Sequence, residues 1–265
     1  MGKRNYHTHT TRCNHACGSD EQFVLSAIRG GFEVLGFSDH SPWDYTPSNF
    51  KGSHIRMRLE EFDEYYTSIS RLKEKYKDQI TIKIGLEVEY FPQYMEWLKT
   101  FIKEKKLDYI IFGNHFYQSD ENGVYYGRGC SDDSILKQYA NDCIEGLKTG
   151  LYSYLAHPDL FMRGRSNFDA LAYEVSYQIC NACKEMNIPL EYNLAGLEVC
   201  ERKHVSQYPH PEFWEIAAEV KNDVIIGCDA HDYHQLETNY YWDEALMHIQ
   251  KLKMNRVDTI HYLTD

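Results

Sequence analysis

The sequence of 265 residues contains no long uninterrupted apolar run. A membrane-spanning helix needs roughly 18 or more consecutive apolar residues, and no segment reaches that length. Residues 1–6 are polar and basic and lack the apolar core of a secretion signal. We therefore expect a cytoplasmic protein that is not associated with a membrane.

Positive charge is also scarce. The chain has 28 Lys and Arg residues against 40 Asp and Glu residues, which gives a formal net charge of −12. Such a surface repels nucleic acids and anionic lipids at long range, so we expect neither as a partner. Bound divalent cations would concentrate positive charge in one cleft, where a small anionic substrate could bind despite the acidic exterior.

The cysteines show no disulfide pattern. With no secretion signal in the sequence, the eight cysteines are expected to be reduced thiols. Cys180 and Cys183 have a CxxC spacing, but they lie in a helical pattern without a second pair. Cys13 and Cys17 flank His15, but a zinc knuckle needs a fourth ligand and none is apparent. We interpret these thiols as structural.

Linkers, repeats and low-complexity segments are absent as well, which favours one domain spanning residues 1–265. Strands are expected at 4–7, 33–38, 80–88, 109–113, 153–156, 189–192 and 224–227. Helices are expected at 21–30, 59–76, 94–105, 132–148, 170–186, 211–221 and 237–253. This alternation predicts an α/β fold with parallel strands closed into one barrel. The irregular segment 39–58 is expected to form a loop over the barrel mouth.

Side chains suited to metal binding follow the expected strands. In a barrel of this kind, functional residues collect at the C-terminal ends of the strands. Residues far apart in the sequence would therefore meet at one mouth. The side chains at these ends are those of His7, His9, His15, Asp39, His40, Glu87, His115, His157, Glu191, Asn193, Asp229 and His231.

Two of these segments have the spacing of a metal-binding strand, namely HTH at 7–9 and DAH at 229–231. Side chains two residues apart on a strand point to the same face, so each pair can hold one cation. A mixed set of imidazoles and carboxylates suits zinc, iron, manganese or cobalt rather than calcium. Glu87 can bridge two metals because a carboxylate has two oxygens.

A single histidine after a strand is more often a hydrogen-bonded core or rim residue than a metal ligand. The combination favours a metal site, because seven of the 13 histidines fall at these strand ends. Among the other histidines, His204 lies near Arg202 and is a candidate substrate contact. Arg163 and Arg202 are candidates for bidentate phosphate clamps, with surface ion pairs as the alternative.

The motifs together resemble those of the polymerase and histidinol phosphatase (PHP) superfamily of metal-dependent phosphoesterases. They are HTH at 7–9, SDHSP at 38–42, GLEVE at 85–89, LAHPDL at 155–160 and IGCDAH at 226–231. The resemblance covers nearly the whole chain and implies a distorted seven-stranded (β/α)7 TIM-like barrel. Among its members, the chain is most similar to the monofunctional histidinol-phosphate phosphatases. EYNLAGL at 191–197 resembles their EINTSGL signature, although it departs from it at Tyr192, Leu194 and Ala195.

The resemblance implies three divalent transition metal ions, which could be zinc, iron or manganese. It assigns His7, His9, Glu87 and Asp229 to the first ion, Glu87, His115 and His157 to the second, and His15, His40 and His231 to the third. Glu87 would bridge two ions. Asp229 would also handle the proton of the attacking water, so that Glu87 and Asp229 are the predicted catalytic residues.

The expected function is hydrolysis of a small phosphomonoester, namely L-histidinol phosphate to L-histidinol and phosphate in histidine biosynthesis. Aromatic residues expected around the mouth (Trp43, Tyr45, Phe116 and Tyr117) would favour the cationic end of that substrate. One alternative is a PHP-type phosphatase or phosphodiesterase for another small phosphorylated metabolite. A second is a replication-associated proofreading or interaction module, and a third is a non-catalytic metal-binding scaffold. The sequence carries no signal for an oligomeric state.

Overall fold

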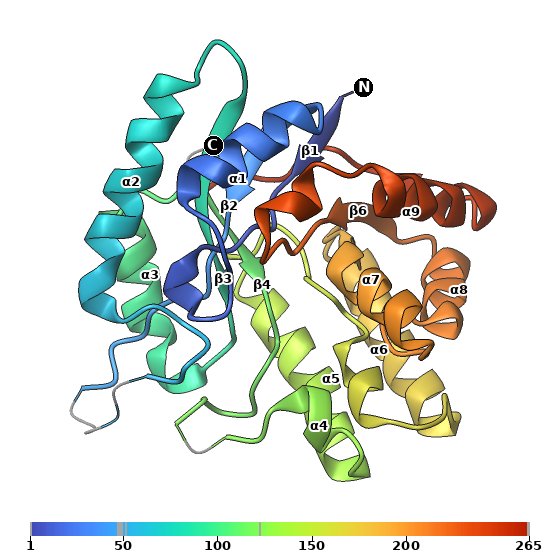
Figure 1. Ribbon diagram of the computed structural model, residues 1–265. Coiled ribbons are helices and arrows are strands. Elements are labelled where there is room, and N and C mark those ends of the chain that lie inside the picture. The colour runs from blue at the N-terminus through green and yellow to red at the C-terminus, as the bar shows by residue number, and fades with distance from the viewer. Residues whose placement is uncertain (1, 47–49, 51, 122, 264–265) are drawn as a thin grey trace.

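The computed structural model describes residues 2–46, 50, 52–121 and 123–263, in which parallel strands are surrounded by α-helices (Figure 1). In that view α2 and α3 lie on the left, α6 to α9 on the right, and α4 and α5 below. The strands are β1 (Lys3–Asn5), β2 (Phe32–Phe37), β3 (Thr81–Val88), β4 (Tyr109–Phe112), β5 (Leu190–Asn193), β6 (Asp223–Gly227) and β7 (Asn255–Arg256). The α-helices are α1 (Asp20–Arg29), α2 (Phe62–Lys75), α3 (Met95–Glu104), α4 (Tyr126–Gly129), α5 (Asp133–Lys148), α6 (Ala170–Glu185), α7 (Leu194–Lys203), α8 (Pro211–Val220) and α9 (Tyr240–Lys251). Short 3-10 helices are η1 (Thr11–Cys13), η2 (Leu59–Glu61), η3 (Pro92–Tyr94), η4 (Leu160–Gly164) and η5 (Tyr233–Leu236).

The strands form two parallel sheets, with the orders β1-β2-β3-β4 and β5-β6-β7. The long strand β3 pairs with β2 through residues 81–84 and with β4 through residues 85–88. The pairing of β3 with its two neighbours is therefore staggered along the strand. Such a stagger is typical of a sheet that curls toward a barrel. The predicted α/β fold with parallel strands is confirmed.

Isolated β-bridges connect the two sheets on both sides. Leu155 bridges to Phe112 at the end of β4 and to Leu190 in β5, and Thr8 bridges to Ala230 beyond β6. The predicted strand at 153–156 is wrong, since only Leu155 forms bridges there. The segment still runs beside β4, because the Ser153 N–H donates to the Ile110 carbonyl and the Ala156 N–H to the Phe112 carbonyl, both at 2.9 Å. The extended segment ends at His157, where φ is 30°. The closed seven-stranded barrel stays a prediction.

Several elements were not expected from the sequence, namely α4, α7 and β7. The start of α7 carries a recognisable signal, because the Asn193 side chain accepts a hydrogen bond from the backbone N–H of Gly196 as an N-cap. The predicted loop at 39–58 contains no helix or strand among its described residues, whereas residues 47–49 and 51 lie outside them. Within the described ranges, no helix combines the length and the apolar character needed to cross a membrane.

A small core cluster contains buried residues of β2, β4 and β6 together with residues of neighbouring segments, and the ring of Tyr109 lies within it. Its members are Tyr6, Val34, Tyr109, Ile111, Tyr154, Ala156, Ile225 and Ile260, with Val257 and Tyr262 packed against it. The hydroxyl of Tyr109 donates to the carbonyl of Tyr6 at 2.7 Å. A Cβ atom would lie 2.2 Å from this hydroxyl at Gly36 and 2.7 Å from the ring at Gly85. The two glycines therefore make room for one large ring between the strands.

Replacing Tyr109 by Ala should lower the free energy of unfolding by about 3–5 kcal/mol, the usual cost of removing a buried aromatic ring. The matched control is Tyr240→Ala, because Tyr240 is 51% exposed and its removal should change stability by no more than about 0.5 kcal/mol. Urea unfolding midpoints of the two variants measure the difference. Equal midpoints would contradict a central packing role for Tyr109.

Candidate metal centre

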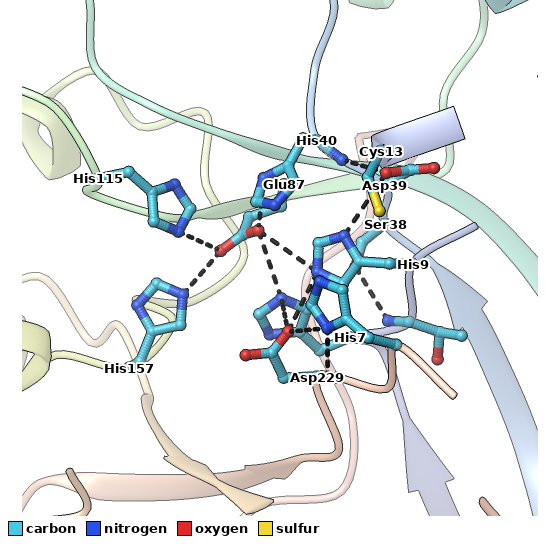
Figure 2. A network of polar contacts seen from close by, with 12 residues as sticks. His7, His9, Cys13, Ser38, Asp39, His40, Glu87, His115, His157 and Asp229 are labelled. Carbon is cyan, nitrogen blue, oxygen red and sulfur yellow. Dashed lines mark hydrogen bonds and ion pairs between the residues drawn. The ribbon is translucent and has the colours of Figure 1, made fainter. Parts of the chain in front are cut away.

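Two carboxylates among the candidate ligands lie at or just beyond the ends of strands β3 and β6. On β3, Glu87 follows Gly85 by two positions, and beyond β6, Asp229 follows Ile225 by four positions. Strand side chains alternate between faces, so Glu87 points to the same side as Gly85, where the Tyr109 ring lies. Asp229 lies beyond the end of β6 with φ 49°, where this alternation no longer applies. Figure 2 shows the result, with His7, His9, His40, Glu87, His115, His157 and Asp229 converging from different segments.

The first group contains four ligand atoms around one point. His7 Nε2 lies 3.5 Å from Glu87 Oε2 and 3.4 Å from Asp229 Oδ1. His9 Nε2 lies 3.6 Å and 3.1 Å from the same two oxygens. Ligands at about 2.1 Å from a tetrahedral zinc ion lie about 3.4 Å from one another. The four atoms therefore have the spacing of a single divalent cation site.

The second oxygen of Glu87 faces a different pair of histidines. Its Oε1 lies 3.3 Å from His115 Nε2 and 2.8 Å from His157 Nε2. The Glu87 side chain is 1% exposed, so water hardly solvates its negative charge. One buried carboxylate thus presents its two oxygens to two separate groups of imidazoles.

The third group consists of His15, His40 and His231, beside His9. The ring of His231 stacks on that of His9 at 4.0 Å and on that of His15 at 4.5 Å between ring centroids. Ligand atoms of His9, His40 and His231 all lie within 4.8 Å of one another. The same is true of Cys13, His15 and His231, so a buried thiol that we interpreted as structural lies next to the cluster.

Several buried imidazole nitrogens in this cluster have no hydrogen-bond partner among the described residues. They are His7 Nε2, both nitrogens of His9, His40 Nδ1, His157 Nδ1 and His231 Nε2. Buried polar atoms are nearly always paired, and leaving one unpaired costs about 1–3 kcal/mol. Such a concentration of unpaired nitrogens beside two carboxylates fits residues that bind divalent metals.

The opposite ring nitrogens of several ligands are held by protein oxygens. His7 Nδ1 lies 2.7 Å from Glu191 Oε1, His15 Nδ1 lies 2.7 Å from the Cys13 carbonyl, and His231 Nδ1 lies 3.0 Å from the Asp229 carbonyl. We assign Nδ1 as the donor in each contact, which leaves Nε2 as the metal-binding atom.

Glu191 supports more than one ligand, a role that was not predicted from its position at a strand end. Its Oε2 accepts hydrogen bonds from the His157 backbone N–H at 3.0 Å and from Asn193 Nδ2 at 2.9 Å. Asn193 Nδ2 also lies 3.1 Å from Asp229 Oδ2. A Cβ atom at Gly227 would lie 1.8 Å from Glu191 Oε1, so this glycine makes room for the carboxylate.

The electrostatics favour the ionisation states that a metal site needs. Burial opposes ionisation of Glu87, but His115, His7 and His40 hold the pKa of its carboxyl well below the usual value. Burial lowers the pKa of His231 to about 3 and that of His40 well below its ordinary value. Anionic carboxylates and neutral imidazoles are the forms that bind divalent cations.

Three ligands behave differently, and one of them is His157, whose pKa is raised against the effect of burial by its contact with Glu87. Burial alone would lower the pKa of His9, but its contacts with Asp229 and Asp39 raise that pKa to about 9. The pKa of His7 is also raised, against the effect of burial, by Glu191, Asp229 and Glu87. Divalent cations in this cluster would take the place of these protons, so metal binding should release protons.

A cavity of about 430 Å³ opens over the cluster. Arg163, which stays a prediction as a phosphate contact, lines this cavity and donates from Nη1 to the Tyr125 hydroxyl at 2.9 Å. Other lining residues that the sequence did not single out are Ile55, Tyr125, Arg128, Leu160 and Tyr208.

Arg202 and His204 do not line this cavity. Arg202 is 66% exposed and pairs with Glu198 at 3.3 Å, and His204 is the exposed C-cap of α7. The cause is α7, which was not predicted. It begins beside the cluster, but ten helical residues carry its C-terminal end about 15 Å away.

Only one of the aromatic residues predicted around the mouth lies at the cavity. Phe116 lines the cavity, whereas Trp43 and Tyr45 are buried in the main hydrophobic core. Tyr117 packs against that core and does not line the cavity, whose aromatic residues are Phe116, Tyr125 and Tyr208.

Comparison with known proteins places these residues in a family. The model of the PHP domain matches residues 5–195. A probable histidinol-phosphatase of Schizosaccharomyces pombe is 35% identical over 261 residues, which cover 89% of this chain and 82% of the relative. The histidinol-phosphatase of Bacillus subtilis is 27% identical over 263 residues, covering 87% and 94%.

Among solved structures, the fold is similar to that of histidinol phosphate phosphatase from Lactococcus lactis, solved in complex with zinc, L-histidinol and phosphate. The TM-score is 0.75 at 21% sequence identity, and the match covers 98% of both chains.

Replacing Glu191 by Gln should weaken divalent metal affinity by about 10- to 100-fold, the usual effect of changing a carboxylate that orients a metal-binding histidine. Zinc competition against a chromophoric chelator measures the affinity, and Glu185→Gln on the exposed end of α6 is the control. Unchanged affinity in Glu191→Gln would mean that the contact with His7 does not support metal binding.

Proposed function

The chain belongs to the PHP domain family, and from this premise we propose that it is a phosphatase that hydrolyses L-histidinol phosphate to L-histidinol and phosphate. The observation that carries the chemistry is the buried carboxylate of Glu87, whose two oxygens face separate groups of histidines. The substrate assignment is supported by the names of the S. pombe and B. subtilis relatives.

We further propose three divalent transition metal ions, with zinc, iron and manganese as the candidates. The first is assigned to His7, His9, Glu87 and Asp229, the second to Glu87, His115 and His157, and the third to His15, His40 and His231. Zinc in the L. lactis structure supports this choice of metals. When bound, such ions neutralise charge on the phosphoryl oxygens and lower the pKa of the attacking water.

The protein's own residues position the reactants and manage the proton. Asp229 lines the cavity, and its Oδ2 lies beside Asn193 Nδ2, whereas its Oδ1 faces the histidines. This carboxylate is the candidate acceptor for the proton of the attacking water. Arg163 lies on the cavity wall, where its guanidinium can hold two phosphoryl oxygens at once.

The walls of the cavity favour the organic part of this substrate. Phe116, Tyr125 and Tyr208 offer aromatic rings for the imidazole and the amine of histidinol phosphate. The net charge of −12 favours a cationic group over a second anionic one. Contacts to the phosphate are common to all phosphate esters, so discrimination must arise at these walls.

We also propose that the bridges of Leu155 and of Thr8 with Ala230 close the two sheets into the distorted seven-stranded barrel expected from the sequence. The similarity to the L. lactis fold supports this closure.

Replacing Arg163 by Ala should reduce kcat/KM by about 10- to 100-fold, corresponding to loss of one charge-assisted contact of about 1.5–3 kcal/mol. Arg202→Ala is the matched control and should leave the kinetics unchanged, because Arg202 lies outside the cavity. Steady-state kinetics on histidinol phosphate test both variants. A larger loss in Arg202→Ala than in Arg163→Ala would reverse the assignment.

The kcat/KM for histidinol phosphate should exceed that for neutral or anionic phosphate esters by at least about 100-fold. This ratio corresponds to roughly 2.7 kcal/mol of differential transition-state binding. A phosphatase screen of the purified protein across sugar phosphates, nucleotides and histidinol phosphate measures this preference. Similar rates for all the esters would favour the alternative of a broader phosphatase. Preferential cleavage of a phosphodiester would favour a nuclease-like activity.

A further inference from the structure

A charged triad is buried behind the metal centre and consists of Arg56, Glu89 and Asp120. Their side chains are at most 1% exposed. Arg56 Nη2 lies 2.7 Å from Glu89 Oε1, its Nη1 lies 3.1 Å from Glu89 Oε2, and its Nε lies 2.7 Å from Asp120 Oδ2. The guanidinium thus binds one carboxylate with two nitrogens and a second carboxylate with the third.

Glu89 connects this triad to a proposed metal ligand. Its Oε1 lies 3.2 Å from His115 Nδ1, while His115 Nε2 lies 3.3 Å from Glu87 Oε1. A histidine that donates its Nδ1 proton to a carboxylate keeps Nε2 free for a cation and has a fixed ring orientation. Glu89 therefore holds His115 in the form that the second metal site requires.

Asp120 connects the same arginine to the substrate cavity. It accepts hydrogen bonds from the Ser53 and Tyr45 hydroxyls as well as from Arg56. Asp120 lies in the segment between Phe116 and Tyr125, whose backbones form an antiparallel bridge and whose side chains line the cavity. Arg56 itself directly follows the lining residue Ile55 in sequence, so two walls of the cavity join at this triad.

Stability alone does not account for the triad. Taking three charges out of water is costly, and well-packed apolar residues in place of buried ion pairs are often neutral or stabilising. The specific consequence of the triad is geometric, since it fixes one imidazole and two wall segments relative to each other.

We propose that Glu89 and Asp120 are positioning residues with separate roles, joined by Arg56. Glu89 fixes His115 for the second metal ion, and Asp120 fixes the cavity wall that contacts the organic part of the substrate. This inference rests on the proposed three-metal phosphatase centre and deepens it.

The two roles predict different effects in two isosteric variants, on metal content in one and on KM in the other. Glu89→Gln should retain about two metal equivalents instead of about three after gel filtration, because loss of a carboxylate that orients a metal-binding histidine weakens metal binding by about 10- to 100-fold. Asp120→Asn should keep the wild-type metal content, with KM for histidinol phosphate raised by about tenfold and kcat nearly unchanged. Asp63→Asn, at an 80% exposed carboxylate, is the control and should match the wild type in both measurements.

Metal content, zinc release to a chelator, steady-state kinetics and circular dichroism are measured on each purified variant. If Glu89→Gln fails to fold, Arg56→Lys replaces it, since lysine keeps the buried charge but cannot bind both carboxylates as a guanidinium does. This variant should lose metal and raise KM together. Wild-type metal content and zinc release in a folded Glu89→Gln or Arg56→Lys variant would overturn the inference alone. A wild type with one equivalent or less would instead contradict the proposed centre, and the inference with it.

Discussion

One buried negative charge organises this protein. The carboxylate of Glu87 lies within 3.6 Å of nitrogens from His7, His9, His40, His115 and His157, and solvent hardly reaches it. A carboxylate in such surroundings is costly unless cations or hydrogen bonds compensate its charge. The curl of the sheet brings the five histidines to it, and Gly113, where a Cβ atom would lie 2.2 Å from Glu87 Oε1, leaves the space.

Much of this arrangement could be predicted because it follows from local rules. Alternating strand and helix patterns predicted parallel strands, and the period of two along a strand predicted the pair of His7 and His9, which both lie near Asp229. The predicted pair at 229–231 is divided, because Asp229 groups with His7 and His9 whereas His231 groups with His9 and His40. The ends of parallel strands share one edge, so the nine expected ligand residues lie together in the structure. The convergence at one edge needed only the spacing of residues along the chain, whereas the set of nine ligands was implied by the resemblance to the PHP superfamily.

Other features depend on contacts between distant segments and left no local pattern. The pairing of Arg56 with Glu89 and Asp120 joins three loops, and each residue alone has the character of a surface charge. Arg202 and His204 were predicted as substrate contacts without any helix expected between Asn193 and these residues. The structure has α7 there, and its ten helical residues place its C-terminal end away from the site.

The packing of the small core determines how much of the chain must be present before the protein can fold completely. Ile260, Val257 and Tyr262 complete the packing around Tyr6 and Tyr109, and Asp229 joins His7 and His9 from the opposite end of the chain. A chain under synthesis therefore has neither the complete small core nor the complete first ligand group until residues 229–262 have been added.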